Sequence, residues 1–346
     1  MPKILMSGND AIAEGAIQAG CSFYAGYPIT PQNELTAYMA NHMQKRGGVF
    51  IQAEAELAAI NMVFGASAAG ARAMTSSSSP GISLKQEGIS YIAGAELPAV
   101  IVNIMRGGPG LGNIAPSQAD YFQATRSGGH GDYHCIVLAP STVQESYDLT
   151  GLAFNLADKY RAPAIILGDG MLGQMMEPVK LTDHKPRPAA KPWALTGCKG
   201  RKANVVKSFY LKEGDLEKLN LKLQKKYKEI QAKEERWEGL FLDDAKVVLV
   251  AYGSMSRIAR SAVKELRARG KRVGLIRPVS LWPFPKKAFT GAKNKYLVIE
   301  MSYGQMLEDV QLALCGKAEV EFLGRSGGGI PSEAEIISKV NKIYNG

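Results

Sequence analysis

The feature that most constrains this chain is an alternation, from Ile4 to about Pro178, of short apolar runs with stretches of small residues that fit helices. Neighbouring strands of a parallel sheet need a helical crossover between them, so this alternation is typical of strand–helix units on a mostly parallel sheet. It predicts an α/β fold. The expected strands are 22–25, 49–52, 71–75, 99–104, 135–138 and 164–167, and the expected helices are 10–19, 31–45, 54–69 and 142–160.

A second stretch of the same kind begins at Lys246. Before it lies a Lys- and Pro-rich segment with Pro186, Pro188 and Pro192 close together, followed by an expected exposed amphipathic helix at 213–240. Because 346 residues suffice for two average domains, we expect domains at 1–182 and 244–346, joined by a basic linker at 183–243. The second domain's expected strands are 247–251, 272–276, 296–300 and 320–323, and its expected helices are 254–269, 305–315 and 332–344.

The basic charge of the chain is concentrated in this linker. Residues 183–239 hold 15 of the 42 Lys and Arg residues but 8 of the 32 Asp and Glu residues, so they supply +7 of the net charge of +10. Basic amphipathic helices are usually solvated, and neither a nucleic-acid motif nor interleaved aromatic residues accompany this one. We therefore expect no nucleic-acid partner, and a nucleic-acid-binding protein is the alternative from another class.

Other sequence patterns exclude several classes of protein. No apolar run approaches the length of a membrane span, and the first residues do not read as a signal peptide, which indicates a cytoplasmic protein with no membrane partner. The four cysteines are far apart and form no C-x-x-C pair, so we expect no disulfide framework and no zinc or iron–sulfur site in this chain.

A GDG triplet, Gly168-Asp169-Gly170, follows one predicted strand. Such a triplet opens the metal–diphosphate motif of thiamine diphosphate enzymes, but that motif is completed by a later Asn, and no Asn occurs between Asn155 and Asn204. We interpret the triplet as a turn after a buried strand and predict no metal ligand there.

Four strand ends are expected to meet at one edge of the first sheet. Arg106 and the glycine-rich loop 107–112 follow one strand, and segments 27–31, 52–56 and 76–81 follow the others. The loop matches neither a dinucleotide-binding nor a Walker motif. Open α/β sheets bind ligands at the carboxyl ends of their strands, so Arg106 is a candidate to hold a carboxylate, the alternative being an arginine in an ordinary surface ion pair.

Glu56 lies in the first turn of a predicted helix whose next residues, 57–65, are nearly all small or apolar. A buried carboxylate is costly unless a donor pairs with it or a proton neutralises it. A ligand nitrogen would satisfy it, and the alternative is a carboxylate that only stabilises the helix N-terminus.

Taken together, five segments resemble the α subunit of the 2-oxoacid:ferredoxin oxidoreductases. They match in order and spacing over nearly the whole chain: GYPITP at 26–31, EAELAA at 54–59, SSSPG at 77–81, RGGP at 106–109 and RPVSLWPFP at 277–285. Within that family, GLGNIAPSQ at 110–118 is most similar to the branched-chain (2-oxoisovalerate) enzymes.

The resemblance implies a division of labour between subunits. Residues 1–182 would form the pyrimidine-type half of a thiamine diphosphate fold, and residues 244–346 a domain like the C-terminal domain of transketolase. A separate β subunit would supply the diphosphate- and Mg²⁺-binding half and an iron–sulfur cluster, with γ and ferredoxin-like δ subunits as further partners. Ferredoxin, coenzyme A and a 2-oxoacid would be the reactants.

Carried onto this sequence, the resemblance implies that Glu56 hydrogen-bonds the pyrimidine N1′ of thiamine diphosphate, with Glu54 as the alternative. The chemistry requires such a group, because a protonated N1′ favours the tautomer that generates the reactive thiazolium carbon. The other implied site residues are Tyr27, Pro28 and Ile29 at the cofactor, Thr30 and Arg106 at the 2-oxoacid carboxylate, and Ser78 and Ser79 as pocket lining.

The implied reaction is oxidative decarboxylation of a branched-chain 2-oxoacid to an acyl-coenzyme A and CO₂, with reduction of ferredoxin. Without its partner subunits the chain is expected to be inactive. Two alternatives stay open: a 2-oxoglutarate enzyme of the same family, and a subunit of a non-redox thiamine-dependent decarboxylase.

Overall fold

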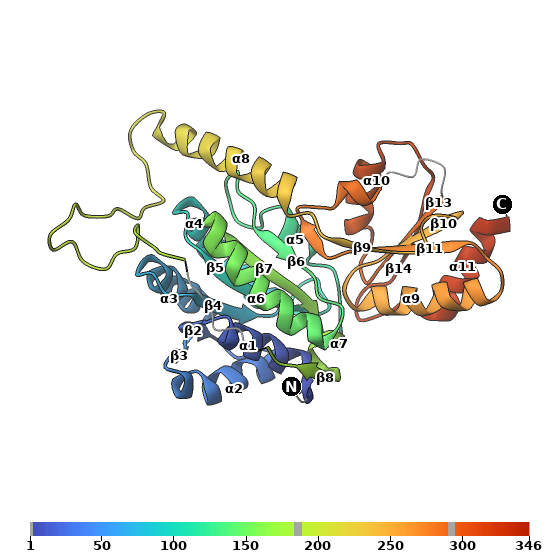
Figure 1. The fold of residues 1–346 in the computed structure, drawn as a ribbon, viewed down its shortest axis with the longest axis horizontal. Helices are drawn as coiled ribbons and strands as arrows, with labels where there is room; N and C mark the ends of the chain where they lie inside the picture. The colour runs from blue at the N-terminus through green and yellow to red at the C-terminus, as the bar shows by residue number, and fades with distance from the viewer. Residues whose placement is uncertain (1–2, 183–188, 290–294, 346) are drawn as a thin grey trace.

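The computed structural model describes residues 3–182, 189–289 and 295–345. They form a seven-stranded and a five-stranded sheet, each with helices on both faces, and a two-stranded ribbon (Figure 1). Part of the predicted linker, 183–188 with Pro186 and Pro188, lies outside the described residues. Along those ranges no helix is both long and apolar enough to cross a membrane.

The first sheet has seven strands in the order β12-β6-β7-β5-β4-β2-β3. The six strands from the N-terminal part of the chain are parallel, and β12 is antiparallel to β6. All six strands expected there are present. Their bounds are β2 Phe23–Gly26, β3 Val49–Gln52, β4 Ala73–Ser77, β5 Ala99–Met105, β6 Ile136–Leu138, β7 Pro163–Asp169 and β12 Ser280–Trp282.

The helices of this sheet lie where right-handed crossovers place them. The connections through α2 and α6 lead to the next strand in one direction along the sheet, and those through α3 and α4 lead in the opposite direction. Accordingly α1 packs on α2 and α6, and α3 packs on α4. Two short helices lie in the connections. The bounds are α1 Gly8–Gln18, α2 Asn33–His42, α3 Glu56–Ala68, α4 Ser79–Gly94, α5 Tyr121–Thr125, α6 Val143–Tyr160 and α7 Gly170–Gln174, with a 3-10 turn at Gln44–Arg46.

The second sheet has five strands in the order β14-β13-β10-β11-β9, all parallel except β9. Helices α9 and α11 pack together on one face, and α10 lies on the other (Figure 1). The four strands and three helices expected here are confirmed. The bounds are β9 Trp237–Leu240, β10 Val247–Val250, β11 Val273–Pro278, β13 Lys295–Glu300, β14 Val320–Gly324, α9 Gly253–Ala268, α10 Gln305–Leu314 and α11 Glu333–Asn345, with a 3-10 turn at Lys286–Ala288.

The predicted amphipathic helix is α8 (Asp215–Lys233), which crosses the amino-terminal edge of the first sheet (Figure 1). It is shorter than predicted, because residues 237–240 pair with β11 and form β9 instead. It buries Leu223, Tyr227 and Ile230, while Leu216 stays exposed. At its end Glu234 is buried and accepts hydrogen bonds from three donors, Lys159 Nζ (2.8 Å), Tyr160 Oη (2.6 Å) and Arg236 Nη2 (2.7 Å). Helix α8 is therefore packed into the fold along its C-terminal half.

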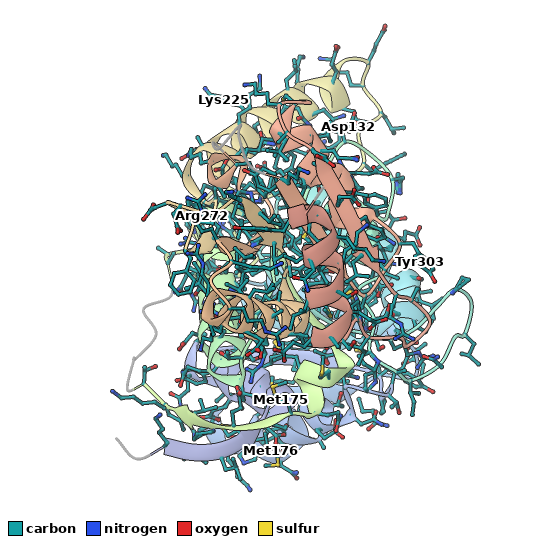
Figure 2. The ribbon with its side chains drawn as sticks, turned by 90° about the vertical axis from the view of Figure 1, so that its right-hand side faces the viewer. Asp132, Met175, Met176, Lys225, Arg272 and Tyr303 are labelled. Atoms are coloured by element: carbon teal, nitrogen blue, oxygen red, sulfur yellow. The ribbon has the colours of Figure 1, made fainter. Side chains whose placement is uncertain are left out.

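Residues 189–214, which precede α8, contain no helix or strand and extend away from both sheets (Figure 1). On the other side of the first sheet, β1 (Lys3–Ser7) and β8 (Met176–Lys180) form an antiparallel ribbon. In Figure 2, Met175 and Met176 mark this ribbon at one end of the molecule, and Lys225 of α8 lies at the other.

Arg277 of β11 joins the second sheet to the first. Its guanidinium is almost completely buried and contacts both oxygens of Glu145, on α6, through Nη2 at 2.7 Å and Nη1 at 3.0 Å. It also contacts Glu238, on β9, through Nε at 3.1 Å and Nη2 at 2.9 Å. One planar cation thus connects three elements from both sheets.

Candidate active site

The predicted site residues lie at the carboxyl ends of four neighbouring strands, β5, β4, β2 and β3. Segment 27–32 follows β2, Glu56 opens the helix after β3, Ser78 and Ser79 follow β4, and Arg106 follows β5. The structure thus brings together at one edge the segments that parallel strand order predicts there.

Glu56 is 6% exposed and lies against the first turn of α4. A Cβ placed on Gly81 would come within 2.6 Å of Glu56 Oε1 and close to Ser77 Oγ, so any larger residue there would displace these side chains. No hydrogen bond to the Glu56 carboxylate occurs within the described residues. The hydroxyl of Ser77, next to the same Gly81 position, and the hydroxyl of Ser78 are buried and have no partner in that part of the chain.

Glu54, the alternative, is exposed and lies before the helix begins. Of these two glutamates, Glu56 is the buried one. Its carboxylate lies over Gly81 next to Ser77, a position that we call the Glu56 cradle. The difference matters because a carboxylate in contact with water gains little from a ligand nitrogen, whereas a buried one needs a partner.

Arg106 is buried, and its guanidinium is already partly engaged. Nη1 donates to the carbonyl of Thr30 at 3.0 Å, and Nη2 donates to the carbonyl of Leu111 at 3.1 Å. Its Nε is buried and has no partner among the described residues. Arg106 therefore ties the loop after β2 to the glycine-rich loop, and Nε is the donor left over in that part of the chain.

Ser79 is held by a small buried network rather than free in a pocket. Its Oγ donates to Asp120 Oδ2 at 2.6 Å and accepts from the backbone N–H of Arg106 at 2.9 Å. Asn103 Nδ2 donates to the same carboxylate oxygen at 2.9 Å. Burial raises the pKa of Asp120, against the hydrogen bonds from Ser79 and Asn103, which lower it. The network fixes the backbone of Arg106.

A second network holds the loop after β2. Gln32 Oε1 accepts from Ser76 Oγ (2.6 Å) and from Thr36 Oγ1 (3.1 Å), and the hydroxyl of Tyr24 bonds to the same two hydroxyls. Gln32 Nε2 then donates to the carbonyl of Tyr27 at 3.3 Å. The loop is fixed through its backbone, while the side chain of Tyr27 and Pro28 are exposed and Ile29 and Thr30 are half-buried.

These features fit the pyrimidine ring of thiamine diphosphate. A flat ring with nitrogen acceptors and an amino group needs a carboxyl partner and hydroxyl partners. Glu56 supplies the carboxyl, and Ser77 and Ser78 supply hydroxyls that have no partner among the described residues. Gly81 leaves the space that the Glu56 carboxylate and the Ser77 hydroxyl occupy. The residues present are therefore suited to that half of the cofactor.

The GDG triplet is not the turn that we predicted: Gly168 and Asp169 end β7 and Gly170 begins α7, so it is a strand-to-helix junction. The carboxylate of Asp169 caps α7 by accepting from the N–H groups of Met171 and Leu172, and it accepts a further hydrogen bond from Ser254 Oγ. Burial raises its pKa. Nowhere in ranges 3–182, 189–289 and 295–345 do three or more His, Cys, Asp or Glu side chains form a group that could hold a metal ion.

Sequence reasoning missed Gly81 and Lys85, which lie on α4, a helix that was not predicted. Lys85 is fully buried and donates from Nζ to Thr75 Oγ1 at 3.1 Å. Burial lowers its pKa to about 8, against the negative charge of Glu56, which raises it. The available signal was the spacing of Gly81, Lys85 and Gly88, which places all three on one face of a helix.

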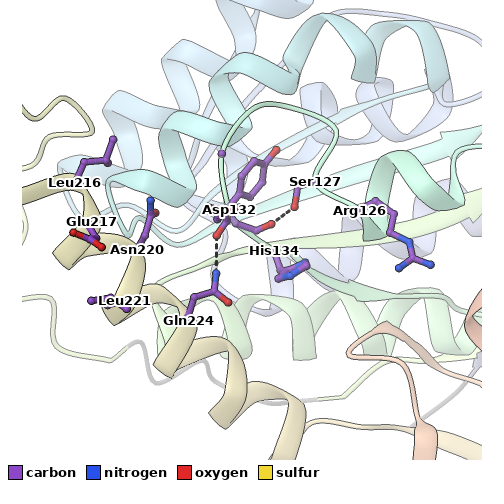
Figure 3. A pocket seen from close by; sticks show the side chains of 11 residues that line it. Arg126, Ser127, Asp132, His134, Leu216, Glu217, Asn220, Leu221 and Gln224 are labelled. Atoms are coloured by element: carbon purple, nitrogen blue, oxygen red, sulfur yellow. Dashed lines mark hydrogen bonds between the residues drawn. The ribbon is translucent and has the colours of Figure 1, made fainter. Parts of the chain in front are cut away.

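A hollow of about 710 Å³ lies at the opposite edge of the first sheet, between α8 and the loop 126–134 (Figure 3). Gln224 of α8 donates to the carbonyl of Asp132 across it at 3.0 Å. The hollow is open and none of its lining residues belongs to the carboxyl edge, so we do not place the substrate there.

Comparisons with known proteins agree with this geometry. Residues 14–236 match the family described as "Pyruvate flavodoxin/ferredoxin oxidoreductase, thiamine diP-bdg", and residues 245–336 match "Pyruvate:ferredoxin oxidoreductase core domain II". The chain is 49% identical to ketoisovalerate oxidoreductase subunit VorB of Methanothermobacter thermautotrophicus, over 99% of this chain and 98% of that one. It is 39% identical to 2-oxoglutarate synthase subunit KorA of Methanothermobacter marburgensis, over 98% of each chain.

Among solved structures, the 2-oxoglutarate:ferredoxin oxidoreductase of Magnetococcus marinus matches with a TM-score of 0.87 and 29% identity. The match covers 99% of this chain but 65% of that longer one, whose structure holds 2-oxoglutarate, coenzyme A and succinyl-CoA. A split-gene transketolase matches with a TM-score of 0.58 at 15% identity, which shows a shared fold alone. This chain belongs to the 2-oxoacid:ferredoxin oxidoreductases, as an α subunit with that family's thiamine diphosphate-binding domain.

Proposed function

We propose that this chain is the α subunit of a 2-oxoisovalerate:ferredoxin oxidoreductase. The assembled enzyme would oxidatively decarboxylate a branched-chain 2-oxoacid to an acyl-coenzyme A and CO₂ and pass the electrons to ferredoxin. The observation that carries the substrate assignment is the 49% identity to a ketoisovalerate oxidoreductase subunit, against 39% to a 2-oxoglutarate synthase subunit of similar coverage.

We assign the cofactor contact to Glu56. Bound thiamine diphosphate supplies a nucleophilic carbon for attack on the 2-oxo group. Glu56 would hold the proton at the pyrimidine N1′, from a position where burial prevents water from competing for the hydrogen bond. Tyr27, Pro28 and Ile29 would form the wall of this half of the site, and Ser78 would offer its unpartnered hydroxyl to the ring.

We assign the substrate carboxylate to Arg106 and Thr30, with Ser79 as support. The unpartnered Nε of Arg106 is the donor for an anion, because the other two nitrogens already hold backbone carbonyls. The carbonyl of Thr30 contacts the same guanidinium. Its hydroxyl accepts from Asn33 Nδ2 at 3.2 Å and would donate its own proton to the anion. Ser79 would act by fixing the Arg106 backbone.

A partner subunit is expected at the mouth of this site. Tyr27, Leu57 and Leu84 expose apolar side chains around the Glu56 cradle, and exposed apolar groups rimming a site mark an interface. We propose that a β subunit covers this edge and brings the diphosphate- and Mg²⁺-binding half and an iron–sulfur cluster. We further propose γ and ferredoxin-like δ subunits, and the cytoplasm as the enzyme's compartment.

We also propose that the chain divides functionally at the boundaries expected from its composition. Residues 1–182 would bind the cofactor, residues 183–243 would link, and residues 244–346 would support the loop that follows Arg106. Two contacts favour that support: Gln118 Nε2 donates to the carbonyl of Tyr252 at 3.0 Å, and Gln118 Oε1 accepts from the N–H of Met301 at 2.9 Å.

The test is to co-purify the chain with its partner subunits and measure viologen or ferredoxin reduction with thiamine diphosphate, coenzyme A and a panel of 2-oxoacids. Reduction with 2-oxoisovalerate ahead of 2-oxoglutarate is expected. The reverse order would assign the chain to 2-oxoglutarate. Failure of every 2-oxoacid to reduce the acceptor, or a partner without iron–sulfur clusters, would refute the redox function.

Within that assay, Glu56→Gln is expected to assemble normally and lose about 10²–10⁴-fold in turnover, the range of general acid–base catalysis, because an amide cannot hold the N1′ proton as a carboxyl does. Glu54→Gln is the matched control, two residues away and exposed, and should stay near wild type. A low activity for Glu54→Gln with a normal Glu56→Gln would move the role to Glu54.

A further inference from the structure

Lys85 is a cation placed where a cation is costly. It is 0% exposed, in the middle of α4, and among the described residues its hydrogen-bond partner is the neutral hydroxyl of Thr75, 3.1 Å from Nζ. An ammonium group has three N–H donors, so one hydroxyl leaves most of its hydrogen-bonding capacity unused. Buried charges persist in folded proteins when another charge compensates them.

Helix geometry shows which charge that is. Gly81, Lys85 and Gly88 follow at intervals of four and three residues, so they share one face of α4. A Cβ on Gly81 would lie 2.6 Å from Glu56 Oε1, and a Cβ on Gly88 would lie 2.5 Å from Ile60 Cγ2. This face of α4 therefore packs against α3. Along the helix axis, Lys85 lies between Gly81, which faces Glu56, and Gly88, which faces Ile60.

Charge supports the same pairing. Burial lowers the pKa of Lys85 to about 8, and the charge of Glu56 opposes that decrease. Lys85 and Glu56 form no direct ion pair in the described part of the chain, so they interact through the protein interior. Charge–charge interactions are stronger there than in water.

We propose that Lys85 is a positioning residue, whose buried ammonium holds the Glu56 carboxylate in place over Gly81 before the cofactor binds. The charge pair stands on the structure alone, and its consequence for thiamine diphosphate rests on the proposed function. No catalytic contact is assigned to Lys85.

The first experiment tests the charge pair by thermal unfolding of the full chain. Lys85→Met and Glu56→Gln should each lower the melting temperature, and the double variant should lose clearly less than the sum of the two shifts, since it removes both charges. The matched control is Lys226→Met, which removes a largely buried lysine that pairs with Glu96 at 2.7 Å, far from the site. Its shift should add to that of Glu56→Gln. An additive result for Lys85→Met with Glu56→Gln would overturn the proposal.

The second experiment measures the affinity of the assembled complex for thiamine diphosphate and Mg²⁺ by calorimetry. We expect binding to be about tenfold weaker in the Lys85→Met variant, because the Glu56 carboxylate is no longer held in place, and unchanged in the Lys226→Met control. Equal affinity of the wild type and the Lys85→Met variant would overturn the proposal. A wild-type complex that binds no thiamine diphosphate would instead refute the proposed function, and the unfolding cycle would still decide on the charge pair.

Discussion

The most direct test of how the two sheets are held together is Arg277→Met. The substitution keeps much of the aliphatic volume and removes a guanidinium that is 2% exposed and makes four contacts of 2.7 to 3.1 Å with Glu145 and Glu238. Both carboxylates are partly exposed and can regain water after the loss. We therefore expect a cost of about 3 kcal/mol, the lower end for breaking a buried ion pair.

The assay is urea unfolding followed by tryptophan fluorescence, because Trp237 and Trp282 lie in the two strands β9 and β12, near this contact. Arg260→Met is the matched control: it also pairs with Glu238, at 2.9 Å, but is exposed, so it should cost less than about 1 kcal/mol. Equal, small effects of the two substitutions would refute the argument that burial makes Arg277 important.

The Arg277 contact also predicts a pH dependence. Hydrogen bonding to Arg277 is the main reason that the pKa of Glu238 is lowered. A lowered carboxyl pKa contributes stability above the unfolded-state pKa and loses it as pH falls through the folded-state value. The difference between wild type and Arg277→Met should therefore shrink as the solution is acidified below the ordinary range of a glutamate.

Two further perturbations follow from the geometry. Gly81→Ala would place a Cβ 2.6 Å from Glu56 Oε1, so the carboxylate must move. We expect at least about tenfold weaker thiamine diphosphate binding by the complex, a loss of about 1.4 kcal/mol, and wild-type affinity would contradict the proposed cradle. Gly65→Ala is the control, because a Cβ there meets nothing within 4 Å. In Glu234, burial raises the pKa, but the hydrogen bonds from Lys159 and Tyr160 outweigh it, so the pKa is lowered. Glu234→Gln should cost about 1–3 kcal/mol at neutral pH, and the cost should diminish as pH falls through the folded-state pKa, measured by melting temperature between neutral and acidic pH. A cost that does not change with pH would show that the charge of Glu234 is not what anchors α8.

The elements that sequence predicts are those whose own residues decide their conformation. Strand β5 is buried throughout and apolar except for Asn103, and it was expected within one residue of its bounds. Strands β9 and β12 were missed because tertiary pairing forms them: β12 is three residues long, and β9 is mostly exposed. Helix α4 was missed because it starts with Ser-Pro-Gly, a turn-like sequence, and carries Lys85 and Gln86 on positions that the fold buries.

The candidate site likewise has one feature that the sequence predicts and another that it does not. Parallel strand order predicts that residues following β2, β3, β4 and β5 share one edge, and they do. What could not be predicted is which groups are left without partners. The carbonyls of Thr30 and Leu111 take two nitrogens of Arg106 only because two loops meet there. The difference between Glu54 and Glu56 likewise depends on where α3 starts, which sequence resolves only to within a turn.

The position of β12 has a consequence for synthesis on the ribosome. Strand β6 lies at the border of the parallel strands, and Ser280–Trp282 cover its free side, more than 140 residues later in the chain. Until that late segment leaves the ribosomal tunnel, the nascent chain carries the apolar edge Ile136–Leu138 uncovered, and an uncovered edge is a template for wrong pairing. Helix α8, which emerges earlier and contacts the residues before β6 through Tyr227, can shield this region during that interval.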